Sequence, residues 1–266
     1  YVVGHVNKIS PEAPVPIFLS EKSKQVLGGA GNVYNNLVSL GVKTTLISAI
    51  GKDNIGNQIE KIVKKIKNNN VYLFKEKNKS STIKTRYSVN GQQLIRVDEE
   101  NTKNFSSLVY KSILSSFKKE LLNHNVVILS DYNKGIFTKK LTNELIKLSN
   151  LNKIPVIVDP KSKDFSFYQN AFLITPNQLE TVQITNLPCN NNIEAKQCGK
   201  YIMKKFSIKN VLITRGDKGL TYIGRKENIH VPTKKIEVFD VSGAGDTVLA
   251  VLSVCISNKI DIKKSL

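Results

Sequence analysis

The stretch Val126-Val127-Ile128-Leu129-Ser130-Asp131 is a short apolar run that ends in polar residues, and it decides the fold because its form recurs. Three later runs are built in the same way, at residues 154–160, 171–177 and 210–216. Segments long enough for helices separate them, at residues 141–148 and 195–206, and the first has apolar side chains at helical spacing. Strands that are apolar throughout and alternate with helices predict an α/β fold, in which a mostly parallel central sheet is flanked by helices.

Polar side chains stand at the ends of these apolar runs. The residues concerned are Asp131, Asp159, Asn177 and Arg215. The carboxyl ends of parallel strands meet at one edge of a sheet, and open α/β sheets bind their ligands outside that edge. We therefore expect the functional site there.

The first hundred residues have a different character. Residues 82–89 and 93–98 alternate loosely around Asn90-Gly91, a dipeptide typical of a hairpin turn. Two apolar segments before residue 20 are suited to pair with them, so we predict a small β-sheet lid inserted into the α/β domain. The lid strands fall within residues 1–20 and 82–98, and the single domain spans residues 1–266.

Length, composition and net charge limit the class of protein to which the chain can belong. The chain has 266 residues, of which 40% are hydrophobic, and that length can bury a sizeable core. Its 40 Lys and Arg against 21 Asp and Glu give a net charge of +19. The basic residues occur in short scattered clusters with Asn and Ile, and no zinc-finger or helix-turn-helix signature accompanies them. We therefore expect a solvated basic surface and no nucleic-acid partner.

Cysteine spacing and hydropathy bear on location. The three cysteines have no CxxC spacing, which predicts no disulfide framework and a reducing, cytoplasmic location. No apolar run reaches the roughly 18–20 residues that cross a bilayer, so we expect no membrane partner. The chain begins with Tyr1, inside a stretch of strand character, so we expect a fragment of a longer protein.

The segment Gly243-Ala244-Gly245-Asp246 precedes an apolar stretch at residues 248–256 that predicts a buried helix. A Gly-Ala-Gly turn at the start of a helix leaves backbone N–H groups without helical partners, and together with the helix dipole they favour an anion. Asp246 stands beside them, where a carboxylate can accept a proton from a hydroxyl while the N–H groups stabilise a phosphate. An Asp N-cap after an ordinary glycine turn is the alternative interpretation.

Competing nucleotide and metal motifs are absent from the sequence. No GxxxxGK[ST] occurs, which excludes P-loop chemistry, and neither Gly-Ala-Gly segment completes GxGxxG. The three histidines have no HExxH spacing, which disfavours a zinc hydrolase.

A series of motifs along the chain resembles the ribokinase/PfkB-type carbohydrate kinases. They are Gly28-Gly29-Ala30-Gly31-Asn32, Thr175-Pro176-Asn177 with Glu180, Thr214-Arg215-Gly216-Asp217-Lys218-Gly219, and Asp240 with Gly243-Ala244-Gly245-Asp246. Residues 9–16, 130–135 and 158–161 are similar to the D-glycero-β-D-manno-heptose-7-phosphate kinases of that family. Those form the kinase half of a bifunctional heptose kinase/adenylyltransferase of lipopolysaccharide core synthesis.

The resemblance implies a ribokinase-like fold and transfer of the ATP γ-phosphate to the C1 hydroxyl of heptose 7-phosphate, with Mg²⁺. It makes Asp246 the base, with Gly243, Ala244 and Gly245 as the anion hole. The residues it places at the nucleotide are Asn177, Gln178, Leu179, Glu180, Thr214, Gly216, Gly219 and Asp240, with Glu180 also reaching the metal through water. It places Gly29 and Asn32 at the sugar.

A substrate that already carries a phosphate also needs cations. The candidates are Arg86, Arg96, Lys134 and Lys161, because two lie on the predicted lid hairpin and two follow strand ends. Ordinary surface charge is an equal alternative for each. Asp131 and Asp159 are candidates for sugar hydroxyls or magnesium, or for capping the helices that follow them.

The sequence also departs from the family pattern. The family has a further strand before the segment that opens here and more structure after Leu266, and the adenylyltransferase domain is absent, so we expect no ADP-heptose from this chain alone. Two alternatives stay open: a ribokinase-family kinase for another sugar phosphate or a nucleoside, and a catalytically silent ligand-binding or scaffolding domain. An exposed lid edge would also allow a homodimer through the lid.

Overall fold

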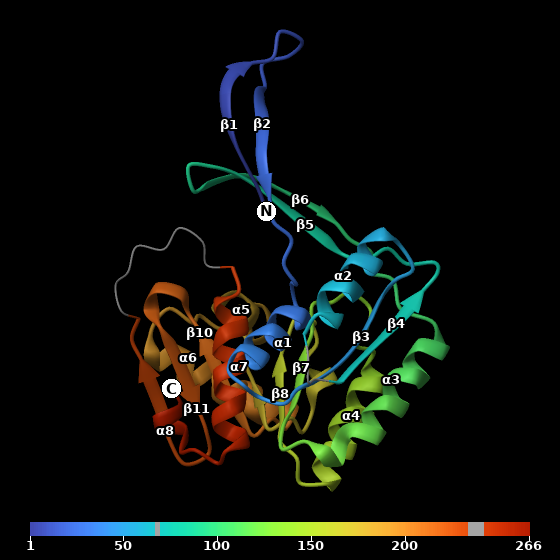
Figure 1. Ribbon diagram of the computed structural model, residues 1–266. Helices are drawn as coiled ribbons and strands as arrows, with labels where there is room; N and C mark the ends of the chain where they lie inside the picture. Colours follow the sequence, from blue (N-terminus) through green and yellow to red (C-terminus); the bar gives the residue numbers. More distant parts are fainter. Residues whose placement is uncertain (67–69, 234–241) are drawn as a thin grey trace.

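The computed structural model describes residues 1–66, 70–233 and 242–266. Figure 1 shows an α/β body with a small β-sheet that projects from it at one end. The two parts are built from segments that alternate along the chain, because the lid strands come both before and after part of the body.

In the part of the chain that the structure describes, the central sheet has six strands in the order β12-β11-β10-β9-β8-β7. They are β7 (Val127–Ser130), β8 (Val156–Asp159), β9 (Leu173–Ile174), β10 (Asn210–Thr214), β11 (Leu220–Ile223) and β12 (Asn228–Val231). β7 to β10 run parallel, and β11 and β12 are antiparallel to their neighbours. The prediction of a mostly parallel sheet is confirmed, although the sequence pattern does not reveal the antiparallel pair.

Helices cover both faces of this sheet, because successive side chains of a strand point to opposite faces. Val156 and Val158 of β8 pack into a core with α3 (Ser107–Glu120), α4 (Lys139–Leu151) and α6 (Asn192–Phe206). Ile157 between them joins a second core with α1 (Ala30–Ser39) and α7 (Ala244–Ser257). All three side chains are fully buried, as expected for a parallel strand covered on both sides.

The helices are α1 (Ala30–Ser39), α2 (Asn54–Lys64), α3 (Ser107–Glu120), α4 (Lys139–Leu151), α5 (Gln178–Thr185), α6 (Asn192–Phe206), α7 (Ala244–Ser257) and α8 (Ile262–Ser265). Short 3₁₀ turns occur at Leu121–Asn123, Phe165–Tyr168 and Gly216–Lys218. Within the described ranges, none of these helices has the length and apolar character that a bilayer span requires.

A second, two-stranded parallel sheet joins β3 (Thr45–Gly51) to β4 (Asn70–Glu76). Tyr34, Leu46 and Val63 form a small separate core between this sheet, α1 and α2. This pair of strands is absent from the sequence-based prediction.

The predicted β-sheet lid is present, and in the described ranges it has four strands in the order β2-β1-β5-β6, an order that the sequence does not reveal. Its strands are β1 (Val2–Ile9), β2 (Pro16–Ser23), β5 (Ile83–Val89) and β6 (Gln92–Glu99). Asn90 and Gly91 take φ values of 48° and 83° in the turn between β5 and β6. An Asn-Gly pair favours these left-handed values, which is why it marks a tight hairpin in the sequence.

A buried lysine joins the two segments that connect β5 and β6 to the body. The Lys79 ammonium donates to the carbonyl of Asn101 at 3.0 Å and to the carbonyl of Lys103. It also lies 4.3 Å from the centre of the Phe105 ring, which belongs to the main core. The hairpin is therefore anchored to the body at its base.

Candidate active site

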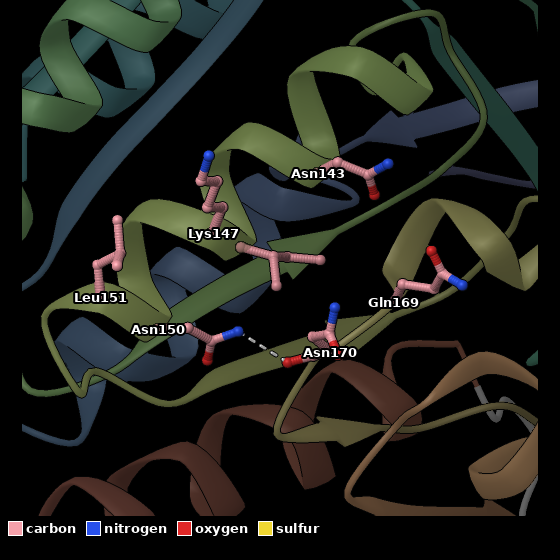
Figure 2. Close-up of a pocket in the computed structure, with 7 residues that line it drawn as sticks. Asn143, Lys147, Asn150, Leu151, Gln169 and Asn170 are labelled. Atoms are coloured by element: carbon pink, nitrogen blue, oxygen red, sulfur yellow. Dashed lines mark hydrogen bonds between the residues drawn. The ribbon is translucent and has the colours of Figure 1, made fainter.

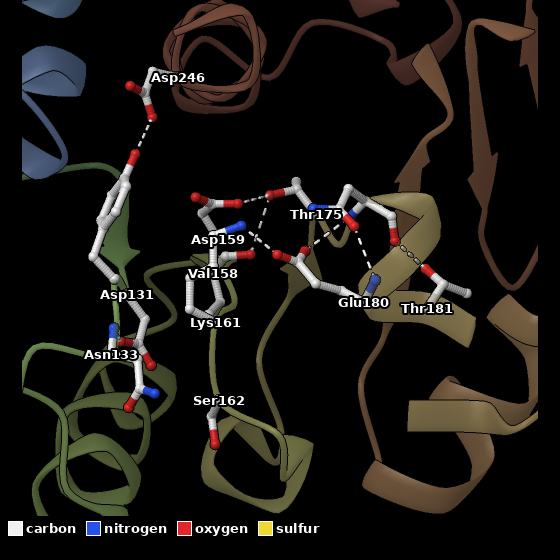
Figure 3. A network of polar contacts seen from close by, with 12 residues as sticks. Asp131, Asn133, Val158, Asp159, Lys161, Ser162, Thr175, Glu180, Thr181 and Asp246 are labelled. Carbon is white, nitrogen blue, oxygen red and sulfur yellow. Dashed lines mark hydrogen bonds and ion pairs between the residues drawn. The ribbon is translucent and has the colours of Figure 1, made fainter. Parts of the chain in front are cut away.

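The carboxyl ends of the parallel strands gather polar side chains at one edge of the central sheet, as predicted. Asp131 follows β7, Asp159 ends β8, and Asn177 follows β9 and is bridged to Thr214 at the end of β10. Figure 3 shows Asp131 and Asp159 of this edge together with Glu180 and with Asp246, which comes from α7. Segments that are far apart in the sequence therefore meet here.

The N-terminus of α7 forms an open glycine turn. Gly243 is the N-cap, with φ 85°, and no side chain of the described residues forms a capping hydrogen bond there. A Cβ on Gly243 would lie 2.9 Å from Nδ2 of Asn32, so the close approach of this side chain also requires glycine. Ala244 and Gly245 are exposed, which leaves the first-turn N–H groups accessible to an anion.

Asp246 lies in the first turn of α7 and is only 8% exposed. Its Oδ2 accepts a hydrogen bond from Nδ2 of Asn32 at 2.7 Å, and its Oδ1 accepts one from the Tyr132 hydroxyl at 2.6 Å. The dashed line at Asp246 in Figure 3 is the second of these. Both carboxylate oxygens are therefore held, and each keeps a lone pair for a further donor.

Tyr132 is a site residue that the sequence-based prediction misses. Burial, followed by the negative charges of Asp246 and Asp159, raises the pKa of the Tyr132 phenol. The phenol therefore remains a hydrogen-bond donor throughout the physiological pH range. The signal in the sequence is weak, because Asp246 lies 114 positions away.

Asn32 contacts Asp246, and Gly29 precedes Asn32 at the start of the same helix. Gly29 is the N-cap of α1 with φ 55°, and a Cβ there would come within 3.3 Å of the Tyr132 ring. Asn32 follows in the first turn of the same helix. The early glycine motif and the C-terminal motif thus form one site through the packing of α1 against α7.

A cluster of carboxyl groups, those of Asp131, Asp159 and Glu180, lies near Asp246. Burial, followed by the charges of Glu180, Asp246 and Asp131, raises the pKa of Asp159 to about 7, although Lys161 lowers it. The Lys161 ammonium donates to Oε1 of Glu180. The cluster is therefore rich in negative charge and is balanced in part by this lysine.

Asn177 and Glu180 form a reciprocal capping box at the start of α5. Oδ1 of Asn177 accepts from the Glu180 N–H at 2.8 Å, and Oε2 of Glu180 accepts from the Asn177 N–H at 2.9 Å. This local role fixes both side chains near the sheet edge. Between them, Gln178 donates weakly to Asn190, and Leu179 is 66% exposed.

The remaining nucleotide candidates surround the turn between β10 and β11. Gly216 and Gly219 adopt φ values of 58° and 79° in this turn, next to Thr214. Arg215 is buried and points to the Asn192 side chain and, at 3.2 Å, to Nδ1 of His230. The predicted contact residue Asp240 lies outside the described residues.

The cations predicted for the substrate phosphate already have partners. Arg86 and Arg96 are directly opposite each other on β5 and β6. Arg96 pairs with Asp98 at 2.9 Å, and the Arg86 guanidinium lies 5.4 Å from the centre of the Tyr1 ring.

The two lysines and Asp131 are also engaged. Lys134 pairs with Glu100, next to the end of β6, at 2.6 Å, and Lys161 pairs with Glu180. Asp131 is 4% exposed and accepts from the Tyr168 hydroxyl at 2.5 Å and from the Asn133 N–H at 2.7 Å. Both oxygens of Asp131 thus bind the protein itself.

A cavity of about 480 Å³ lies away from this site. Asn143, Lys147 and Asn150 of α4 line it together with Gln169 and Asn170, as Figure 2 shows. It opens at the amino-terminal ends of β8 and β9, opposite the edge that carries Asp159. No three His, Cys, Asp or Glu side chains of the described ranges converge there or elsewhere as a ready-made metal site.

A mostly parallel central sheet, a β-sheet lid and a glycine turn that presents a buried carboxylate define a ribokinase-like α/β fold. The chain belongs to the pfkB family of carbohydrate kinases, whose family model matches residues 1–266. The family membership that the motifs predict is therefore confirmed.

Two relatives illustrate the likeness in sequence. "Bifunctional protein HldE" of Aliarcobacter butzleri is 37% identical over 266 residues, which are 100% of this chain and 56% of the relative. "Bifunctional protein HldE" of a Nitratiruptor species is 38% identical over 265 residues, with the same shares of the two chains. The chain thus spans about half the length of the curated relatives it matches.

Solved structures show the same fold at lower identity. The tetrameric inhibited form of phosphofructokinase-2 from Escherichia coli superposes with a TM-score of 0.77 at 18% identity, covering 99% of this chain and 86% of that one. The same enzyme in complex with fructose-6-phosphate gives a TM-score of 0.76 at 18% identity, with the same coverage. This likeness establishes the fold.

Proposed function

We propose that the chain is an ATP-dependent kinase that phosphorylates D-glycero-β-D-manno-heptose 7-phosphate at C1 and forms the 1,7-bisphosphate. The observation that carries a kinase function is the buried carboxylate of Asp246 beside the open N–H groups of α7, with Asn32 in contact. These are the two elements that phosphoryl transfer to a hydroxyl needs, a proton acceptor and a site for phosphate charge.

The chemistry assigns a role to each of these groups. The sugar hydroxyl donates to a free lone pair of Asp246, and its oxygen attacks the γ-phosphorus as the bond to the leaving ADP breaks. The proton passes to Asp246, while the N–H groups of Ala244 and Gly245 stabilise charge on the phosphate oxygens. Asn32 holds the carboxylate and the Gly29 turn lets the sugar approach closely.

The carboxyl cluster at the sheet edge suits Mg²⁺. This ion keeps several waters and is usually held by one or two carboxylates together with substrate phosphates. Asp159 would hold the ion directly, and Glu180 would hold it through water. The acidic neighbours of Asp159 help to raise its pKa, so the site carries negative charge that a cation would balance. When bound, the ion would neutralise charge on the transferring phosphates.

The lid offers a place for the phosphate that the substrate already carries. Arg86 lies directly opposite Arg96 on the neighbouring strand, and Asp98 already balances the charge of Arg96. Among the described residues, the Arg86 guanidinium has no carboxylate within ion-pair distance, so it is the better candidate of the two for a phosphate. The same face of the lid carries Asp98 by strand alternation, and Glu100 next along reaches Lys134 of the body. That face therefore lies toward the body, where a bound sugar phosphate would be.

The choice of heptose rests on the resemblance of residues 9–16, 130–135 and 158–161 to the heptose 7-phosphate kinases and on relatives named bifunctional protein HldE. Another sugar phosphate or a nucleoside is the second candidate. The structural neighbour solved with fructose-6-phosphate makes that sugar the first comparison to include.

The test is a panel of acceptors incubated with ATP and Mg²⁺, with ADP release and the ³¹P spectrum of each product recorded. Heptose 7-phosphate should give the highest kcat/KM, with a new C1 phosphate signal. Unphosphorylated heptose is the matched control and should be a poor substrate. Preference for fructose 6-phosphate or adenosine would replace heptose as the substrate, and no ADP from any acceptor would favour a silent binding domain.

We also propose that two copies associate through the lid. Ile9, Leu19 and Ile95 are 60%, 43% and 57% exposed on this sheet, and its outer strands β2 and β6 have no further strand partner among the described residues. Apolar side chains beside open strand edges favour pairing with a second copy. Sedimentation equilibrium should show a dimer that Ile95→Lys weakens, and a monomer at high micromolar concentration would contradict it.

A further inference from the structure

We infer that Tyr132 is a positioning residue that holds the carboxylate of Asp246 in the orientation needed to accept the proton of the sugar hydroxyl. The inference rests on the proposed kinase function. Its basis is the pair of hydrogen bonds that fix Asp246, one from the Tyr132 hydroxyl to Oδ1 and one from Asn32 to Oδ2. With only one of them, the carboxylate could rotate about its Cβ–Cγ bond.

The Tyr132 side chain is itself held in place. Its ring packs under the turn at Gly29, where a Cβ would come within 3.3 Å of the ring. The Tyr132 ring therefore lies against the side of Gly29 on which any other residue would carry its side chain. A larger residue at position 29 would push the phenol away from Asp246.

The loop that carries Tyr132 is fixed on both sides of the tyrosine. Asp131, just before it, accepts hydrogen bonds from the Tyr168 hydroxyl and the Asn133 N–H. The carbonyl of Gly135, three residues after it, accepts from the Tyr110 hydroxyl at 2.6 Å. These hydrogen bonds therefore fix the backbone that carries Tyr132.

The phenol holds the base and does not compete with it for the proton. Burial and the nearby carboxylates keep Tyr132 protonated, because they raise its pKa, so it acts as a permanent donor toward Oδ1 of Asp246. A fixed donor leaves the free lone pairs of the carboxylate in a constant direction, and a base held in a constant direction meets the hydroxyl more often in reactive geometry. Tyr132 thereby adds to kcat without contacting ATP.

The experiment compares Tyr132→Phe with Tyr110→Phe, using ATP and the best acceptor of the panel. Each variant loses one phenol hydroxyl that donates a hydrogen bond of 2.6 Å, Tyr132 to Asp246 and Tyr110 to the Gly135 carbonyl, and the Tyr110 hydroxyl also accepts from the Phe105 N–H at 3.0 Å. Tyr110 therefore supports the segment that carries Tyr132 but does not contact Asp246. Tyr132→Phe should lower kcat about 10- to 100-fold, the range for a lost hydrogen bond to a charged group. KM for both substrates should stay within about threefold. Tyr110→Phe should keep more than half of the kcat.

A second variant separates positioning from damage to the fold. In an Asp246→Asn background, the Tyr132→Phe change should alter the residual transfer of radiolabelled phosphate by less than about twofold, because the group it positions is gone. A further loss of tenfold or more there would overturn the inference. It would also be overturned if Tyr132→Phe kept more than half of the kcat, if it raised KM alone, or if Tyr110→Phe lost as much. A wild-type chain that phosphorylates no acceptor would instead refute the proposed function.

Discussion

Replacing Asp159 by Asn should stabilise the protein, and the gain should grow with pH. Burial and the surrounding carboxylates raise the pKa of Asp159 to about 7 in the native chain, whereas an unfolded Asp has a pKa of about 3.9. Between these values the native chain binds more protons than the unfolded chain does. The free energy of unfolding that depends on this group is therefore fully present below pH 4 and is lost as the pH rises to 7.

The size of the effect follows from the two pKa values. At pH 5 the native carboxyl is still protonated and the unfolded one is already ionised, so part of the loss has occurred. From pH 5 to its pKa of about 7 the native carboxyl keeps a proton that the unfolded one has lost. Each of these two pH units lowers the free energy of unfolding by about 1.36 kcal/mol, and above pH 7 the loss levels off. The stabilisation by Asp159→Asn should thus be about 2–3 kcal/mol larger at pH 8 than at pH 5.

Urea unfolding followed by circular dichroism at the two pH values measures this difference. Asp98→Asn is the control, because Lys84 and Arg96 lower the pKa of that exposed carboxyl, which is therefore ionised in both states above pH 5. Its effect on stability should be the same at pH 5 and pH 8. An equal effect of Asp159→Asn at both pH values would refute the assignment of a raised pKa.

Two substitutions test the glycine turn and the lid. Gly243→Ala places a Cβ 2.9 Å from Asn32 Nδ2 at φ 85°, so it should cost about 1–2 kcal/mol in thermal unfolding and lower kcat at least ~10-fold. Gly41→Ala, with φ 76° in open space, should lower stability alone, and equal kcat values for the two variants would contradict the role of the turn. Arg86→Ala should raise KM for a phosphorylated acceptor about tenfold or more in steady-state kinetics and leave an unphosphorylated acceptor unaffected. Arg225→Ala serves as the control for Arg86→Ala, because Arg225 lies at the edge of the central sheet opposite the candidate active site. Equal changes in KM for the phosphorylated and the unphosphorylated acceptor would exclude phosphate recognition by Arg86.

Much of the fold could be predicted from the sequence because its strands and turns carry local signals. The apolar runs at 126–131 and 154–160 became β7 and β8, and Asn90-Gly91 became the lid turn. The parallel pair β3 and β4 and the antiparallel strands β11 and β12 escaped prediction. Of these, β4 and β12 are partly exposed and mixed in composition, so their pairing depends on tertiary packing that short patterns do not encode.

The site was predictable where backbone geometry dictates the residue type. Gly29 and Gly243 have positive φ values, and such positions leave glycine signatures in a sequence. The contact between Tyr132 and Asp246 leaves none, since it joins the loop after β7 to α7 across the fold. The roles of the cations were harder to predict. Lys134 pairs with Glu100 and Lys161 with Glu180, and a sequence does not show which acidic residue a lysine contacts.

Under the proposed function, Asp246 is the proton acceptor of a sugar kinase. The most direct test is the turnover of Asp246→Asn with ATP and the best acceptor, measured with ATP affinity by calorimetry. Asp164→Asn, which changes a carboxylate that caps a 3₁₀ turn, is the control and should keep its turnover. We predict that Asp246→Asn lowers kcat by at least ~10³ while ATP still binds. Turnover above about a tenth of the wild-type value would contradict the claim.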